Sequence, residues 1–120
     1  MTTKTVDKKI AIVNSDKPII YDGQSALDFA VSIGYEHDCQ NIALNKEAIA
    51  EDFFKLSTGI AGEVVQKFVN YGYRLAIIGD FSKYTSKPFH DYIYECNKGK
   101  HLYFVADEEM AMEKLGGVIE

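Results

Sequence analysis

The sequence predicts a single-domain α/β sandwich in which a mostly parallel sheet is covered by helices. Short apolar runs typical of buried strands alternate along the chain with segments whose apolar residues recur at helical spacing. This alternation favours a parallel sheet, because each helix carries the chain back across one face to start the next strand. The length of 120 residues and the apolar content of 47% suit one domain with one core. We expect about five strands and four to five helices.

The first two strands are expected to form a β-hairpin. The runs 10–13 and 19–21 are rich in isoleucine and are separated by NSDKP, whose residues favour turns. Residues 1–8 and 117–120 flank the predicted elements and are expected to be loose.

The segment after the hairpin changes to helical spacing. SALDFAVSIG has Ser25 in the N-cap position and Asp28 three residues later, as in a capping box. The short apolar run 41–45 then predicts a buried strand, and residues 46–56 predict one short amphipathic helix.

The remainder of the chain predicts three helices separated by the strands RLAIIGD and HLYFVAD. The first of these helices ends at Gly72, which accepts the left-handed C-cap conformation. The second has Ser86 as its N-cap and Gly99 as its stop. The last begins with acidic residues, which the helix dipole favours, and is expected to end at Gly116 or Gly117.

Charge and hydropathy argue against two classes of partner. The net charge is −5 and the basic residues are dispersed, so no broad cationic face is available for nucleic acid. The apolar runs are far shorter than the roughly 20 residues that cross a bilayer. The charged start is followed by no secretory apolar region, so we expect a cytoplasmic protein. Cys39 and Cys96 lack CxxC spacing and are expected to be reduced thiols without a chemical role.

The segment AEDFFKLSTGIAGEVVQKFVNYGYRLAIIGD resembles the central part of the STAS domain, the fold of bacterial anti-sigma-factor antagonists. In that family a strand is followed by Asp-Ser-Ser/Ala-Gly-Leu, a helix, a glycine and another strand. The motif serine and the three positions after it correspond to Ser57, Thr58, Gly59 and Ile60. The resemblance implies a STAS-like fold and a switch, in which a partner kinase phosphorylates the serine and the added charge decides whether a partner is bound. Leu56 stands where the family has Asp, and KEAIAEDFFK is inserted before the motif.

Nearly the whole chain, from Lys8 to Leu115, also resembles a family of small bacterial proteins described only as a domain of unknown function. The phrases IALNKEAIAEDFFKLSTG, GDFSKYTSKP and ECNKGKH carry this resemblance. It implies membership of a family and no particular activity.

The turn that precedes the helix at Gly59 is the first candidate site. A phosphate at a helix N-terminus would meet free backbone N–H groups and the positive end of the dipole. The same position suits an unmodified N-cap. Ser57 is therefore predicted to be either a cap or a phosphoacceptor, with Thr58 as the alternative residue. The candidate partner contacts beside it are Gly59, Ile60 and Glu63.

The loop 80–88 is the second candidate site. It follows a predicted strand, and ligands of open α/β sheets bind outside the carboxyl ends of the strands. Lys83, Ser86 and Lys87 are candidates for holding a phosphate or a carboxylate there. The loop lacks the glycines of a nucleotide-binding motif, so an ordinary connection with a helix cap is the alternative.

The remaining polar residues form no motif that carries chemistry. Asp22, Asp80 and Asp107 at strand ends are expected to be caps and turn residues rather than metal ligands, and no metal or cofactor is predicted. The three histidines have no nucleophile beside them in a known arrangement. Asn45 occupies the place where a receiver domain would carry its phosphorylated Asp, which argues against that class.

These patterns favour a non-enzymatic regulatory or protein-binding module with an unidentified protein partner. The alternative is a small anion- or nucleotide-binding protein, or an enzyme, with its site at the carboxyl ends of the parallel strands. The tyrosines of the second half suit either a homo-oligomer interface or partial burial within the fold.

Overall fold

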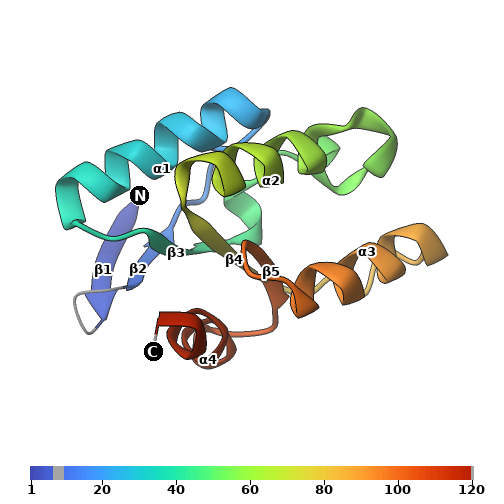
Figure 1. Ribbon diagram of the computed structural model, residues 1–120. Helices are drawn as coiled ribbons and strands as arrows, with labels where there is room; N and C mark the ends of the chain where they lie inside the picture. Colours follow the sequence, from blue (N-terminus) through green and yellow to red (C-terminus); the bar gives the residue numbers. More distant parts are fainter. Residues whose placement is uncertain (7–9, 120) are drawn as a thin grey trace.

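The computed structural model describes residues 1–6 and 10–119, without the side chains of 117–119, and contains one five-stranded sheet in the order β1-β2-β3-β4-β5 (Figure 1). β1 is antiparallel to β2, and the other neighbours are parallel. The strands are β1 Thr2–Val6, β2 Ile10–Asn14, β3 Asn41–Asn45, β4 Arg74–Ile78 and β5 Leu102–Val105. The α-helices are α1 Gly23–His37, α2 Ile60–Tyr71, α3 Lys87–Lys98 and α4 Glu108–Ile119. The predicted single-domain, mixed α/β fold with about five strands and four helices is confirmed.

The strand order decides which face each helix covers. Because β2 to β5 are neighbours in chain order and point the same way, right-handed crossovers place the three connecting helices on one face. Figure 1 shows α1 and α2 on one side of the sheet, α4 on the opposite side and α3 beside β5. Phe89 of α3 belongs to the same core as the buried residues of α1 and α2.

Strand residues alternate between the two cores that result. Ile42 and Leu44 face the larger core beneath the connecting helices, whereas Ala43 between them faces α4. Ala111 and Leu115 of α4 are fully buried against this second face. In the described part of the chain, no helix is long and apolar enough to cross a membrane.

The predicted hairpin is wrong in its partner. β2 pairs with β1, whose residues Thr2–Val6 had been expected to be loose, and the connecting residues 7–9 lie outside the described residues. The run 19–21 makes only an isolated parallel bridge between Ile20 and Ile49. The N-terminal segment is rich in β-branched threonine, which suits an edge strand that is half exposed.

The predicted helix over 46–56 is also wrong. The segment folds as three short 3₁₀ turns, which are η1 Lys46–Ala48, η2 Glu51–Phe54 and η3 Leu56–Thr58. The residues between η1 and η2 are extended, because the Ala50 N–H donates to the Ile20 carbonyl at 2.8 Å. The adjacent residues Phe53 and Phe54 of η2 are both buried.

Two predicted helix ends are corrected and three are confirmed. The N-cap of α1 is Asp22, and Ser25 is the reciprocal partner in its capping box. α4 runs through both of its glycines to Ile119, so its predicted end is wrong. Gly72, with φ of 76°, ends α2, Ser86 caps α3 by accepting from the Phe89 N–H, and Gly99 ends α3.

Candidate functional site

The loop 80–88 lies at the carboxyl ends of the parallel strands beside η2, which precedes the turn at Ser57. The loop 79–86 follows β4, and η2 belongs to the connection that follows β3. The Tyr84 hydroxyl in the loop donates to the Glu51 carboxylate in η2 at 2.8 Å. The Lys83 ammonium lies 3.2 Å from the same carboxylate oxygen. Glu51 therefore joins two segments that are more than thirty residues apart in the sequence.

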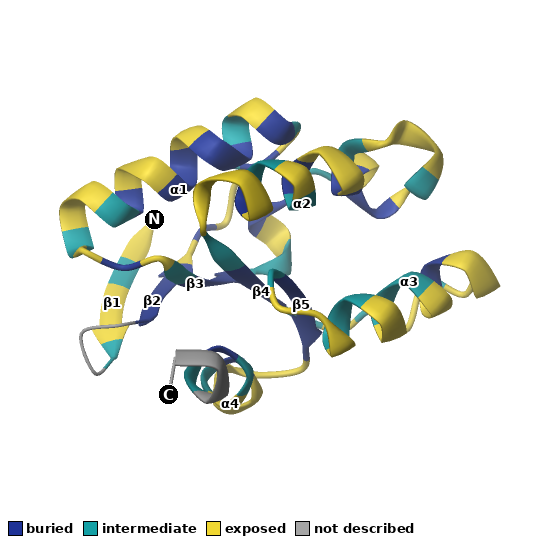
Figure 2. Cartoon of the chain, in the orientation of Figure 1, coloured by how far each residue is buried: buried dark blue, intermediate teal, exposed yellow. Residues whose placement is uncertain are grey.

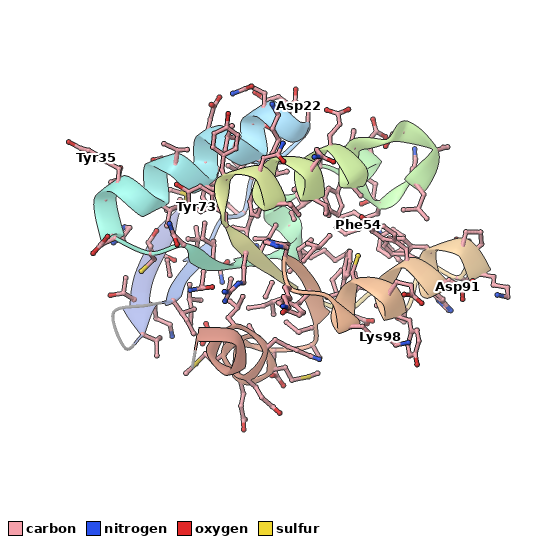
Figure 3. All side chains as sticks on the ribbon, in the orientation of Figure 1. Asp22, Tyr35, Phe54, Tyr73, Asp91 and Lys98 are labelled. Atoms are coloured by element: carbon pink, nitrogen blue, oxygen red, sulfur yellow. The ribbon has the colours of Figure 1, made fainter. Side chains whose placement is uncertain are left out.

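An aromatic cluster lies beneath this polar link. The Phe54 ring stacks on the Tyr84 ring, with the ring centroids 5.0 Å apart. The centroids of Phe81 and Phe89 lie 6.0 and 6.2 Å from that of Phe54. Phe104 of β5 contacts both Phe81 and Phe89 at 5.2 and 5.8 Å. Figure 3 shows Phe54 among side chains that fill the space between η2 and α3. The loop is thus held to the body of the domain by ring packing as well as by charge.

Lys46, at the start of η1, brings a positive charge to this cluster. Its ammonium lies 5.2 Å from the Tyr84 ring centroid and 5.9 Å from that of Phe54. Its stem packs on Gly79, where an added Cβ would lie 2.7 Å from the Lys46 Cβ. Among the described residues it belongs to no ion pair.

The carboxylates around Lys46 are held in the ionised form. The pKa of Glu51 is lowered, first by the Tyr84 hydrogen bond and then by Lys83 and Lys46. The pKa of Asp80 is lowered chiefly by the Ser82 N–H, with a smaller contribution from Lys46. Burial and the Glu51 carboxylate raise the pKa of Tyr84, so its hydroxyl remains a proton donor.

The candidate phosphoacceptors Ser57 and Thr58 are both exposed in η3, but their hydroxyls differ. The Thr58 hydroxyl is 2.8 Å from the carbonyls of both Asp52 and Lys55, whereas no hydrogen bond of the Ser57 hydroxyl occurs among the described residues. The predicted N-cap role is wrong for both, because Gly59, with φ of 76°, is the N-cap of α2. Thr58 instead accepts from the Ile60 N–H at 3.3 Å.

The acid that the STAS motif carries before its serine has no clear substitute. Leu56 at that position is half-buried against the core. Asp52 forms an ion pair with Lys55 at 3.5 Å, and Glu51 is engaged by Lys83 and Tyr84.

The three candidate partner contacts have distinct surroundings. Gly59 is exposed, and Ile60 is half-buried against the core. Glu63 is exposed, but its carboxylate accepts from the Gly23 N–H at 3.3 Å. A Cβ on Gly23 would lie 3.0 Å from the Glu63 Cβ, so Glu63 helps to pack the N-terminal ends of α1 and α2 together.

The candidate anion-binding residues are engaged with protein groups. Lys83 pairs with Glu51, and Lys87 pairs with Asp91 along α3 at 2.8 Å. Ser86 caps α3. The lysines thus extend towards carboxylates on different elements.

An open groove of about 490 Å³ lies beside the loop, at the carboxyl ends of β4 and β5. It has an apolar floor and one carboxylate, and its lining residues are Gly79, Asp80, Phe81, Phe104, Val105, Ala106 and Met110. None of the predicted anion-binding residues lines it.

The other polar candidates have structural partners. Asp22 and Asp107 cap α1 and α4, and Asp80 accepts from the Ser82 N–H in its turn, as predicted. In the described ranges no group of His, Cys, Asp or Glu side chains is arranged to hold a metal ion. Cys39 and Cys96 are free thiols, and burial raises the pKa of both.

The tyrosines of the second half divide between surface and interior. Tyr71 and Tyr94 are exposed, whereas Tyr103 is buried. The others are half-buried and lie against the larger core, and they are Tyr73, Tyr84 and Tyr92.

Sequence analysis missed Lys46 and Glu51 as members of the site. Lys46 directly follows a predicted strand, a position that the sequence marks but that many structural residues share. Glu51 lay in a predicted helix, and only its contacts with Lys83 and Tyr84 single it out.

Comparison with known proteins adds a family and nothing more specific. No curated protein matches the chain, and no solved structure matches it. A family model does match residues 5–115, which include every strand of the parallel sheet, both candidate segments and the groove. The chain therefore belongs to the family described as Domain of unknown function (DUF4180).

Proposed function

We propose that this domain is a non-enzymatic regulatory module of STAS-like character, which acts in the bacterial cytoplasm by binding a protein partner. Its contact surface is the combined surface of residues 51–60 and 80–88, here called the carboxyl-edge surface. The single observation that carries the proposal is the Tyr84–Glu51 hydrogen bond of 2.8 Å, because it makes one continuous surface of these two segments.

The composition of the carboxyl-edge surface supports binding rather than catalysis. Its lysines are paired with carboxylates, as Lys83 is with Glu51 and Lys55 is with Asp52. Exposed pairs of this kind contribute little to folding stability but can guide a partner of complementary charge. The rings of Phe54 and Tyr84 hold the surface in place, so a partner meets a largely preformed contact.

Ser57 is the phosphoacceptor in this proposal, with Thr58 as the alternative. Ser57 is exposed and its hydroxyl has no described hydrogen-bond partner, whereas the Thr58 hydroxyl is within hydrogen-bond distance of two carbonyls. A phosphate on Ser57 would add negative charge next to the Asp52–Lys55 pair and to the start of α2. We expect the added charge to change the affinity for the partner.

The switch is tested by capturing partners from cells of the source bacterium with wild type, Ser57→Ala, Ser57→Asp and Thr58→Ala. We expect Ser57→Asp to change the amount of one partner at least tenfold relative to Ser57→Ala, and Thr58→Ala to behave as wild type. The intact mass of the wild-type protein isolated from these cells should show one added phosphate, and that of Ser57→Ala should show none. Equal capture by all four proteins without a phosphate mass would contradict the switch.

The contact surface is tested separately with Tyr84→Phe, which removes only the hydroxyl that joins the two segments. We expect weaker capture of the same partner, measured against Tyr94→Phe as the matched control. Tyr94 is exposed on α3, outside the carboxyl-edge surface. Equal capture by the two variants would argue that the partner binds elsewhere.

Lys46 favours a second candidate function, the binding of a small anionic ligand at the carboxyl ends of the parallel strands. Its stem packs on Gly79, directly after β4, and among the described residues its ammonium belongs to no ion pair. A ligand that binds only the native state must raise the thermal midpoint. We expect millimolar phosphate or a nucleotide to raise the midpoint of wild type and not that of Lys46→Met, and an unchanged wild-type midpoint would exclude this candidate.

A further inference from the structure

The two edges of the sheet are protected differently. At β5, the outward-facing backbone of Phe104 is bonded to one side chain of α3. The Asn97 amide oxygen accepts from the Phe104 N–H at 2.8 Å, and the amide nitrogen donates to the Phe104 carbonyl at 3.2 Å. The amide thus occupies the place of a neighbouring strand's peptide group, which closes this edge to another chain.

The β1 edge has no such cover. Among the described residues, the backbone hydrogen bonds of β1 are those of its ladder with β2. Figure 1 shows β1 as the outermost strand, with no element beyond it, and Figure 2 shows most of it as exposed. Its residues, TTKTV, are mostly β-branched and include no proline, so the strand is well suited to accept a further strand.

The one charge on β1 is already neutralised within the chain. A lysine on an edge strand normally discourages pairing with another strand. Here the Lys4 ammonium lies 3.2 Å from the Glu108 carboxylate at the start of α4. This pairing lowers the repulsion that a second Lys4 would otherwise meet.

An open hollow of about 450 Å³ lies between Met1, the residue before β1, and the start of α1. Met1, 71% exposed, and Tyr21, 59% exposed, lie at its surface, and Phe29 lies beneath them. Exposed apolar side chains next to an open edge are what a partner strand would cover.

We propose that β1 is a dimerisation strand, which pairs antiparallel with β1 of a second copy and extends the sheet through both molecules. A second copy is the partner that fits, because the same strand serves both sides of a two-fold contact and its one charge, Lys4, is already paired with Glu108 of its own chain. In an antiparallel pair about a two-fold axis, a residue lies opposite its own copy. If the two-fold axis passed beside Lys4, the two Lys4 ammonium groups would face each other. If it passes beside Thr3, Thr3 faces the partner's Thr3 and Met1 faces the partner's Thr5.

This register predicts which residue can be cross-linked. Opposed Cα atoms in an antiparallel pair lie about 4.5–5.5 Å apart, within the range that a disulfide spans. In a Cys96→Ser background, Thr3→Cys should form a disulfide-linked dimer under mild oxidation, which a reductant returns to monomer. Thr5→Cys lies on the same strand and face and should cross-link at least tenfold less, as should the exposed Ser57→Cys on another element.

The mass of the unmodified protein in solution completes the test. Light scattering after size exclusion should give about twice the chain mass of 13.5 kDa at micromolar concentration. A monomer at every concentration would overturn the proposal. So would a dimer without the Thr3→Cys cross-link, or equal cross-linking at all three positions. Partner capture plays no part here, so failure of the proposed function would leave this result standing.

Discussion

Replacement of Phe54 by alanine is expected to lower the free energy of unfolding by about 3–5 kcal/mol, the range typical of truncating a buried phenylalanine. The Phe54 side chain is 4% exposed and contacts the rings of Phe53, Phe81, Tyr84 and Phe89. Removing it leaves a cavity between η2 and the loop 79–86, which these rings hold together. The loss is a large share of the about 5–15 kcal/mol that stabilises an ordinary domain.

Urea denaturation followed by circular dichroism measures this effect, with Tyr94→Ala as the control. Tyr94 is also an aromatic residue, but it is 62% exposed and contacts Lys98 on the surface of α3. We expect Tyr94→Ala to change stability by about 0.5 kcal/mol or less. Similar losses for the two variants would mean that the cluster around Phe54 is not packed as described.

Replacement of Asn45 by aspartate is expected to cost about 1–3 kcal/mol at neutral pH, the penalty for polar groups left without partners. The Asn45 amide continues the pairing of β2 with β3 beyond their last paired residues, Val13 and Leu44. Its oxygen accepts from the Ser15 N–H at 2.8 Å, and its nitrogen donates to the Ser15 carbonyl at 2.6 Å and to Glu47 at 3.1 Å. A carboxylate at this position would still accept from the Ser15 N–H, but it could not donate to the Ser15 carbonyl or to Glu47. One of its oxygens would instead face these two oxygen atoms.

The cost of Asn45→Asp should depend on pH. The neighbouring oxygens disfavour the charged form, so the pKa of the introduced carboxyl is raised in the folded state above its unfolded value of about 3.9. The variant therefore approaches wild-type stability below the unfolded pKa and loses stability as pH rises through the folded pKa. Denaturant titrations of both proteins between acidic and neutral pH measure the difference.

Asn70→Asp is the matched control for this experiment. Asn70 is exposed on α2, and its oxygen accepts from Gln66 at 3.2 Å, a bond that a carboxylate keeps. We expect a change of about 0.5 kcal/mol or less. A pH-independent loss for Asn45→Asp, or an equal loss for the control, would contradict the assigned role of Asn45.

The sequence predicted the strands β2 to β5 and the helices α1 to α4 because hydrophobic periodicity is a local property. The apolar runs at β3, β4 and β5 and the helical stripes between them can be identified without knowing their neighbours. The capping residues Ser86 and Gly72 were predicted for the same reason, since their roles depend on a few adjacent residues.

Prediction from local hydrophobic spacing failed where a segment pairs with a different part of the chain from the one expected. The run 19–21 looks like a strand, but β1 takes the ladder of β2 and leaves Ile20 a single bridge to Ile49. That bridge holds the chain extended before η2 and overrides the helical spacing of 46–56. Ser57 is likewise not a cap, because Gly59 in the left-handed conformation reorients the chain before α2.

For the candidate site, the sequence by itself identified the turn and helix start at Ser57 and the loop 80–88, because polar and hydroxyl residues stand there between predicted elements. Only the tertiary structure decided that Glu51, Tyr84 and Phe54 join them. The parallel order of β3 and β4 brings both connections to one edge of the sheet, where side chains far apart in the sequence come within hydrogen-bond distance. The sequence determined the elements because their patterns are local, and the fold determined the surface because contacts between distant residues depend on how the strands pair.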